Sequence, residues 1–166
     1  MSYVEDMISV KREEWLPRDY LVGPVKHREI SRWTDLEAHH LGSTPLAAWG
    51  GDPFKAWTSA FMYHTLGKGW QDIWYQLGIH PDGRLVELRG AGAANSSRPY
   101  MAVNLPGADE TTEAQWDTIH KLRLAMHKDG AGTGLRYHAM RGGTTCPGRK
   151  TIDRIHKIWA AEKTTG

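Results

Sequence analysis

The sequence predicts a mixed α/β domain, in which about three main helices pack on one central mixed β-sheet. Along the 166 residues, short runs rich in β-branched and aromatic residues alternate with longer amphipathic segments. Several of the amphipathic segments begin at capping residues and end at glycine. The chain shows no internal repeat. We therefore expect one domain over residues 1–166, with an N-terminal segment over 1–34 and the main body over 35–161.

Composition excludes several classes of protein. A content of 40% hydrophobic and 24% charged residues is typical of a globular domain. The net charge of +2, from 21 basic and 19 acidic residues, is too balanced to favour nucleic-acid binding. The chain contains no apolar run long enough to predict membrane insertion, and its first residues lack the apolar core of a signal peptide. The single cysteine cannot form a disulfide within the chain.

The N-terminal third contains a helix, a strand and a second helix. A short helix is expected after Ser9, through "VKREEW", in a segment that the prolines at positions 17 and 24 make irregular. "WTDLEAHHLGS" predicts a strand running into a glycine turn, and a loop follows. A longer helix is expected from Pro53, since proline suits a first helical turn. Its predicted apolar stripe is Phe54, Trp57, Phe61 and Leu66.

The remainder predicts a hairpin, two strands and two helices. In "DIWYQLGIHPDGRLVELRG", two strand-forming runs flank the turn at residues 81–83, where Gly83 can take a positive φ. "PYMAVNLPG" predicts another strand. A long helix follows Thr112, which forms a capping box with Gln115, and Gly130 ends it. "LRYHA" predicts a short strand, and a closing helix follows "CPG".

Histidines and the single cysteine lie where predicted strands and loops end. His39 and His40 end one strand, His138 ends another, and Cys146 precedes the closing helix. Two imidazoles and one thiolate form a catalytic zinc set that leaves the fourth position to water, whose pKa the metal lowers to about 7. Spacing alone leaves two alternatives open. One is a buried cysteine among unrelated histidines, and the other is a Cys–His nucleophilic site.

Four sequence blocks resemble the zinc-dependent N-acetylmuramoyl-L-alanine amidases, the family shared by phage lysozyme-type amidases, bacterial amidases and peptidoglycan recognition proteins. "MISVKREEW" resembles the family's opening segment, and "AHHLGS" resembles its first zinc-binding strand. "YHTLGKGWQDIWYQLGIHPDGRLVELRG" resembles the central block, and "HAMRGGTTCPG" the closing block. Many spacings agree at once in the last two blocks. The resemblance covers most of the chain and makes residues 35–161 the catalytic core.

The resemblance implies roles for individual residues. It makes His39, His138 and Cys146 the ligands of one catalytic Zn²⁺. Tyr75 matches the tyrosine that faces the scissile carbonyl, although a core aromatic is the alternative interpretation. Thr144 is assigned a hydrogen bond to the developing oxyanion, and its alternative is a turn-stabilising hydroxyl.

Substrate-binding roles follow from the same resemblance. His64, His40 and Trp70 are assigned to substrate binding, with Trp49 and Trp57 as further candidate walls of an elongated cleft. For His64, a helix-end histidine bonded to the backbone is the competing interpretation. Asp72 is interpreted as structural, and Glu87 and Arg89 as a structural pair or a rim of the groove.

The sequence departs from the family pattern at three places. Leu41 and Gly42 replace the usual Thr-Ala after the histidine pair, Met140 stands in place of an aspartate, and Trp74 stands in place of the glycine before the tyrosine. None of these changes removes a predicted zinc ligand. They leave the shape of the pocket, and with it substrate preference, open.

The implied reaction is hydrolysis of the amide bond between N-acetylmuramic acid and L-alanine of peptidoglycan. We expect a monomer whose partner is bacterial peptidoglycan. Without a signal peptide, a phage endolysin is the favoured member: it is made in the host cytoplasm and reaches the wall after the membrane is permeabilised. The alternatives are a non-catalytic peptidoglycan-binding module, a structural zinc domain with His40 as fourth ligand, and a cytosolic amidase that recycles muropeptides.

Overall fold

The computed structural model describes residues 2–17, 20, 25–42 and 44–165. Six strands form one sheet: β1 (Ile8–Val10), β2 (Asp35–His39), β3 (Leu77–Ile79), β4 (Leu85–Glu87), β5 (Tyr100–Asn104) and β6 (Gly134–Tyr137). The α-helices are α1 (Tyr3–Asp6), α2 (Arg12–Trp15), α3 (Pro53–Met62), α4 (Glu113–Lys128) and α5 (Arg149–Thr165). Shorter helical turns are η1 (Ile30–Arg32), η2 (Leu46–Trp49), η3 (Tyr63–Gly67) and η4 (His138–Arg141).

The strands are arranged in the order β1-β4-β3-β5-β2-β6. All neighbouring pairs are parallel except β3 and β4, which form the antiparallel hairpin predicted around residues 81–83. Gly83 takes the positive φ of 98° that this turn requires. The predicted fold class, a mixed α/β domain with a single mixed sheet, is confirmed.

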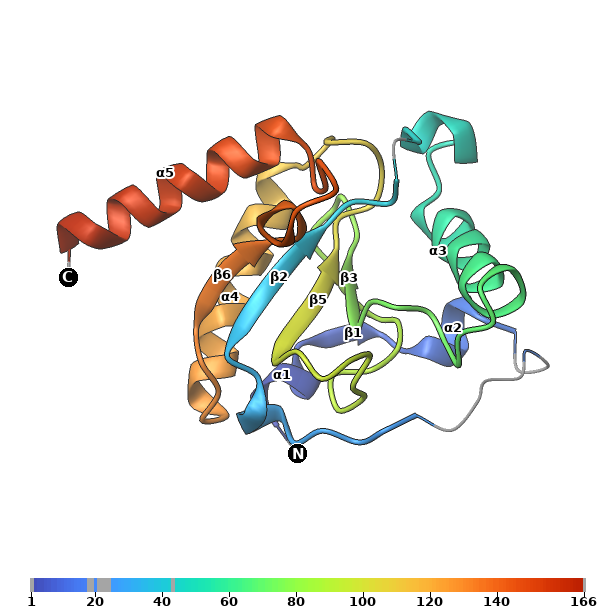
Figure 1. Ribbon diagram of the computed structural model, residues 1–166, viewed down its shortest axis with the longest axis horizontal. Helices are drawn as coiled ribbons and strands as arrows, with labels where there is room; N and C mark the ends of the chain where they lie inside the picture. The colour runs from blue at the N-terminus through green and yellow to red at the C-terminus, as the bar shows by residue number, and fades with distance from the viewer. Residues whose placement is uncertain (1, 18–19, 21–24, 43, 166) are drawn as a thin grey trace.

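Helices cover the two faces of the sheet unequally (Figure 1). One face packs against α1, α4 and α5, and its core includes Leu36, Met101 and the predicted α4 stripe. A second core joins β1 and β4 to α2 and α3 through Val10, Val86, Trp57 and Phe61. In Figure 1, α4 lies behind β6 and next to β2, whereas α3 stands to the right and leaves the front of β2 and β5 uncovered.

The short helix predicted through "VKREEW" is present as α2, but it begins two residues later than expected. Residues 8–10 form strand β1, with Ile8 and Val10 buried and Ser9 exposed, and the helix begins only at Arg12. This alternation has the period of a strand, and pairing with β4 satisfies the backbone there. The N-terminal segment therefore contributes a strand to the central sheet. Part of its predicted irregular stretch, including the proline at position 24, lies outside the described residues.

The two long helices at the C-terminal end follow their predicted patterns. Thr112 and Gln115 form the expected capping box of α4, whose buried stripe is Trp116, Ile119, Leu122 and Met126. By contrast, the stripe predicted for α3 fails at its end, because the backbone changes to a π-turn at Tyr63 and Leu66 is 76% exposed. None of the described helices combines the length and the apolar character needed to cross a membrane.

Candidate metal centre

Two adjacent parallel strands bring the predicted histidines together. β2 pairs in parallel with β6, so the carboxyl ends of both strands lie at the same edge of the sheet. His39 is the last residue of β2, and His138 follows β6 directly, as the first residue of η4. The centroids of the two imidazole rings are 4.7 Å apart. This edge of a parallel sheet is where α/β proteins commonly bind ligands.

Backbone hydrogen bonds hold Cys146 beside these histidines. The carbonyl of Cys146 accepts a hydrogen bond of 2.8 Å from the N–H of Ala139 in η4. The N–H of Cys146 donates to the hydroxyl of Thr144 at 3.1 Å, and its Sγ accepts the N–H of His40 at 3.2 Å. The thiol is buried. The loop between η4 and α5 is therefore tied to both histidine-bearing segments.

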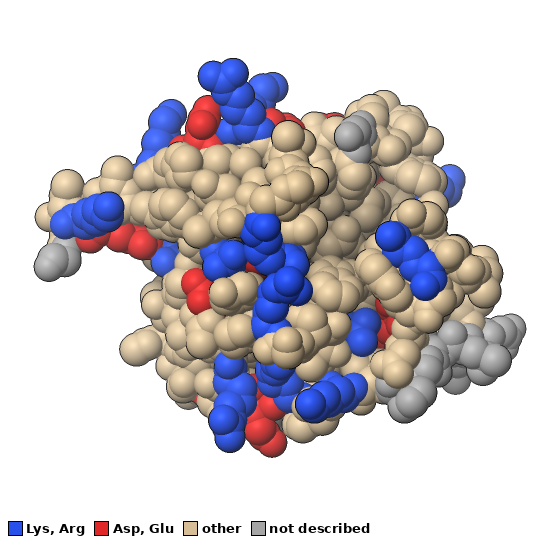
Figure 2. Space-filling view, viewed as in Figure 1, with Lys and Arg blue, Asp and Glu red and all other residues tan. Residues whose placement is uncertain are grey.

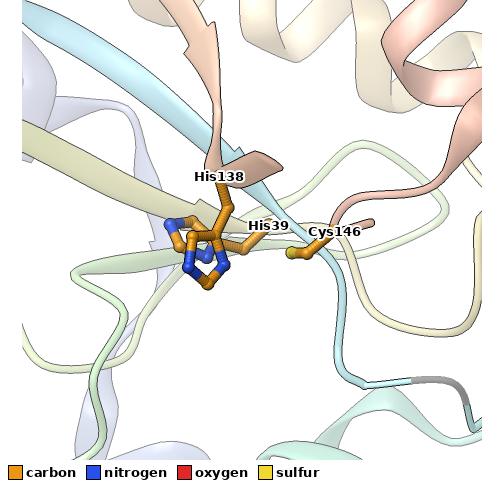
Figure 3. Close-up of side chains that lie close together, drawn as sticks. All are labelled: His39, His138 and Cys146. Carbon is orange, nitrogen blue, oxygen red and sulfur yellow. The ribbon is translucent and has the colours of Figure 1, made fainter. Parts of the chain in front are cut away.

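The three side chains form a cluster that suits zinc. One ligand atom from each of His39, His138 and Cys146 lies within 4.8 Å of the others, and Figure 3 shows the three side chains converging. Nitrogen and sulfur donors are those that zinc prefers, and three protein ligands leave one position open. The Nε2 atom of His39 is occupied by a contact with Glu37 at 2.9 Å, which leaves Nδ1 of this ring available to a metal.

Burial shapes the ionisation of the candidate ligands. Burial lowers the pKa of His138 to about 4, and the nearby charges of His39 and Arg141 act in the same direction. Burial also lowers the pKa of His39. The imidazoles are therefore neutral at pH 7, which is the form that binds metal. Burial raises the pKa of the Cys146 thiol to about 12, so a metal ion must displace its proton on binding.

An open cavity of about 270 Å³ adjoins the two histidines. Lys and Arg side chains are more prominent than Asp and Glu side chains on the face viewed in Figure 2, and a hollow opens near its centre. The cavity combines aromatic walls with several polar groups, as ligand sites commonly do. Its lining residues are His39, His64, Trp70, Trp74, Tyr75, His138 and Arg141.

Tyr75 and His64 both line this cavity, and the Tyr75 hydroxyl lies 3.5 Å from the carbonyl oxygen of His40, to which it donates. Burial raises the pKa of the Tyr75 phenol above its usual range, as does the nearby Cys146, so the hydroxyl keeps its proton at neutral pH. The Nδ1 of His64 accepts the backbone N–H of Trp74 at 3.0 Å. The proton of the neutral His64 ring therefore lies on Nε2. The sequence offered two interpretations of His64, a histidine bonded to the backbone and a residue of the cleft. The structure agrees with both, because the ring accepts a backbone N–H and also lines the cavity.

His40 and Thr144 lie outside the lining of the cavity. His40 directly follows the last residue of β2, its ring is not part of the convergent ligand cluster, and its Nδ1 is buried without a partner among the described groups. The Thr144 hydroxyl caps the turn by accepting the Cys146 N–H. The assignment of His40 to substrate binding and of Thr144 to the oxyanion stays a prediction.

The tryptophans predicted to line a cleft have different environments. Trp70 lines the cavity and is 39% exposed. The prediction that Trp57 forms a wall is wrong, because its side chain is fully buried and its Nε1 donates to Asn104 at 2.8 Å. Trp49 is not among the lining residues. Trp74, noted in the sequence only as a departure, forms part of the wall instead.

Sequence reasoning missed Glu37 and Arg141. Glu37 lies two residues before His39 on the same face of β2 and is 2% exposed. Burial would raise the pKa of its carboxyl, but hydrogen bonds and charges from His39 and Arg141 outweigh burial and lower the pKa to about 2. Period-two alternation in "EAH" was the only signal that placed Glu37 beside His39. Nothing in the sequence indicated that Arg141 would reach this carboxylate.

Other polar residues near the site are structural. Asp72 pairs with Arg12, as its structural interpretation suggested. The suggested pair of Glu87 and Arg89 does not form: Glu87 accepts the backbone N–H of Arg12, and Arg89 donates to the carbonyls of Ile73 and Ala94. Met140 is 47% exposed in η4.

The fold is the one shared by peptidoglycan recognition proteins and an endolysin amidase, as comparison with solved structures shows. Drosophila PGRP-LB superposes with a TM-score of 0.69 at 21% identity, over 88% of this chain and 91% of that one. Peptidoglycan recognition protein-LE, solved in complex with tracheal cytotoxin, gives a TM-score of 0.69 at 19% identity, over 92% and 94% of the two chains.

The endolysin N-acetylmuramoyl-L-alanine amidase LysCS from Clostridium intestinale gives a TM-score of 0.65 at 17% identity, over 92% of this chain and 97% of that one. No family model matches the sequence, and no curated protein is a match. At these identities the likeness establishes the fold.

Proposed function

We propose that this protein is a zinc-dependent N-acetylmuramoyl-L-alanine amidase that cleaves the amide bond between N-acetylmuramic acid and L-alanine of peptidoglycan. The observation that carries the proposal is the convergence of ligand atoms from His39, His138 and Cys146 beside an open cavity. The same fold occurs in an endolysin of this activity and in a recognition protein solved with a peptidoglycan fragment. A bound Zn²⁺ would polarise the scissile carbonyl and activate a water molecule for attack.

The residues of the cavity would position the amide and stabilise developing charge. The Tyr75 hydroxyl keeps its proton and is a donor for the carbonyl oxygen, whose negative charge grows as the tetrahedral intermediate forms. The Thr144 oxygen accepts from Cys146 and retains its own hydrogen to donate to the same oxyanion. Hydrolysis adds the water oxygen to the lactyl carbonyl carbon, breaks the C–N bond and delivers a proton to the amine of L-alanine.

The remaining wall residues would bind the stem peptide and the sugar. The Nε2–H of His64 is a donor for a peptide carbonyl, and the exposed indole of Trp70 offers a flat face for a sugar ring. In this proposal His40 supports the site through its backbone N–H, which donates to the Cys146 sulfur. The enzyme acts as a monomer on the bacterial wall.

The biological setting we propose is that of a phage endolysin. The protein would be made in the host cytoplasm and would reach the wall after the membrane is permeabilised. The correspondence of fold with LysCS over 92% of this chain supports this setting. A recycling amidase differs in its substrate, because it would prefer soluble muropeptides over intact sacculi.

The test is a product analysis on intact peptidoglycan. Purified protein is incubated with sacculi, with and without a chelator, and new L-alanine amino termini are counted against new reducing sugar ends. We expect alanine termini without reducing ends, loss of activity on chelation, and its restoration by zinc. Cys146→Ser should abolish release, while Asp153→Asn, a change at an exposed position of α5, should leave release unchanged. Zinc binding without release by the wild-type protein would contradict the proposal.

A further inference from the structure

A buried carboxylate lies directly behind the candidate ligand His39. Glu37 and His39 point from the same face of β2, and each residue is only 2% exposed. The Oε1 atom of Glu37 is 2.9 Å from the Nε2 atom of His39. A buried, ionised carboxylate is stable only when paired and hydrogen-bonded. The partners of Glu37 therefore decide how firmly it is held.

Two arginines from separate elements orient this carboxylate. Arg136 lies opposite Glu37 in the β2–β6 register and donates from Nε to Oε2 at 2.9 Å. Arg141 in η4 donates to Oε1 at 2.7 Å. Both arginines are largely buried, with side chains 16% and 19% exposed. The carboxylate is therefore fixed by contacts from both sides and has little freedom to rotate.

The same network joins the segments that carry the two histidines. Glu37 lies on the strand that ends at His39, and Arg141 lies in the turn that begins at His138. The ion pair between Glu37 and Arg141 thus connects the two ligand-bearing segments next to the cavity. Glu37 itself is not one of the groups whose ligand atoms converge, so its contact with the metal site is through His39.

We propose that Glu37 is a positioning residue that accepts the Nε2–H of His39, fixes the orientation and tautomer of that ring, and presents Nδ1 to the metal. The inference rests on the proposed zinc site. A histidine that donates one N–H to a carboxylate has its other nitrogen free and more basic, and such outer partners typically change metal affinity 10- to 100-fold, by order of magnitude. Arg136 and Arg141 serve this role by holding the carboxylate in place.

The first test measures zinc affinity by competition with a chromophoric chelator. Glu37→Gln keeps the side-chain shape and removes the charge, and its amide must turn an N–H group toward either His39 or Arg136. We expect zinc affinity to fall by roughly 10- to 100-fold, while circular dichroism shows that the protein remains folded. The double variant Glu37→Gln, Arg136→Gln removes the conflict between donors. With its NH₂ on the side of residue 136, the amide introduced at position 37 can again turn its oxygen toward the Nε2–H of His39, so stability and part of the zinc affinity should recover.

The matched control is Arg136→Gln alone. This change breaks an ion pair of the same network at Oε2, the oxygen that does not contact His39. We expect a loss of stability comparable with that of Glu37→Gln and a smaller change in zinc affinity. Equal zinc affinity in wild type and Glu37→Gln would overturn the proposal, as would equal losses of affinity in Glu37→Gln and Arg136→Gln.

A second measurement reads the ring of His39 directly. Long-range ¹H–¹⁵N spectra of the zinc-free protein should show the neutral His39 ring protonated on Nε2, and Glu37→Gln should add the other tautomer. Observation of Nδ1–H in the wild type would overturn the proposal. Neither readout involves hydrolysis. If zinc binds in a Glu37-dependent way and peptidoglycan is not cleaved, the proposed function fails while this inference stands.

Discussion

The guanidinium of Arg12 forms a two-point hydrogen bond with the carboxylate of Asp72, at 2.8 and 2.7 Å, across 60 positions of the chain. Arg12 also donates to the carbonyl of Leu88 at 2.7 Å, and its own backbone N–H donates to Glu87. The opening motif is thereby attached to the central block that supplies the cavity wall. Bidentate arginine–carboxylate pairs of this kind are among the stronger polar contacts in proteins.

Breaking this pair should cost stability. Asp72 is 2% exposed, so Asp72→Asn leaves a partly buried guanidinium without its counter-charge. We expect the free energy of unfolding to fall by about 3 kcal/mol, at the lower end of the range for such losses because Arg12 is 21% exposed. Urea denaturation monitored by tryptophan fluorescence measures this change.

The control for this prediction is the exposed ion pair of Lys121 and Asp117 on α4. Asp117→Asn should change the free energy of unfolding little, because exposed pairs are screened by solvent. Equal losses for Asp72→Asn and Asp117→Asn would show that the N-terminal attachment contributes no more than a surface contact.

Local sequence patterns predicted most helices and strands of this fold, but they could not predict contacts between residues far apart in the chain. The capping box at Thr112 and the hairpin turn at Gly83 depend on neighbouring residues, so the sequence showed them directly. Strand β1 was missed because three residues are too few to establish a period. Its partner β4 lies far along the chain, and the hydrogen bonds and side-chain packing between the two strands stabilise the extended conformation of β1.

The candidate site shows the same division. The three predicted ligands converge in the structure. Local patterns had located the strand ends and the loop that carry them, and the family resemblance had selected these three residues. Glu37 escaped prediction because a single glutamate in a strand is indistinguishable from a solvated one until its two arginines are placed. Trp57 also belonged to the predicted apolar stripe of α3, and its burial agrees with that stripe and not with the cleft wall that the resemblance suggested.

The packing of Trp57 against Gly78 provides a second prediction. A Cβ atom added at Gly78 in β3 would lie 2.6 Å from Cζ2 of the indole, and the hydrogen bond to Asn104 restrains the ring. Gly78→Ala should therefore lower the free energy of unfolding by about 1–3 kcal/mol through overpacking. Thermal and urea denaturation measure the loss.

The matched control for overpacking is Gly92→Ala. A Cβ atom there would meet nothing nearer than 3.4 Å. We expect a clearly smaller loss than for Gly78→Ala. Equal losses of stability for the two variants would show that replacing glycine by alanine costs the same at either position, and that the contact with Trp57 contributes nothing.

His64 should make stability depend on pH. Burial lowers its pKa to about 4, and Lys68 and Arg89 contribute in the same direction. Between about pH 4 and the ordinary histidine pKa near 6.5, the unfolded chain binds more protons than the folded one at this residue. Stability from His64 is therefore complete above about pH 6.5 and is lost as pH falls toward 4.

The measurement compares wild type with His64→Gln by urea denaturation at pH 5 and pH 7, in the presence of chelator. Glutamine can still accept the Trp74 N–H but does not titrate. The stability of the wild type relative to the variant should be lower at pH 5 than at pH 7. A difference that does not vary with pH would show that His64 titrates alike in the folded and unfolded chain.

Asp109 connects the start of α5 to the rest of the domain, and its substitution provides the last prediction. Its carboxylate accepts the backbone N–H groups of Lys150 and Thr151 at 2.8 and 2.9 Å and the Thr151 hydroxyl at 2.7 Å. Its backbone has a φ of 58°, which aspartate and asparagine tolerate better than alanine. Asp109→Ala should thus lose a helix cap, at about 1–2 kcal/mol, and also add backbone strain.

Asp109→Asn separates these two contributions. Asparagine tolerates the left-handed backbone and keeps one oxygen for Thr151, but it gives up the second acceptor and the negative charge that favours a helix N-terminus. Its free energy of unfolding should lie between those of wild type and Asp109→Ala. Because Cys146 lies just before α5, zinc affinity should follow the same order. Equal stability of the two variants would contradict the prediction, because it would mean that neither the backbone conformation at position 109 nor the retained asparagine oxygen contributes.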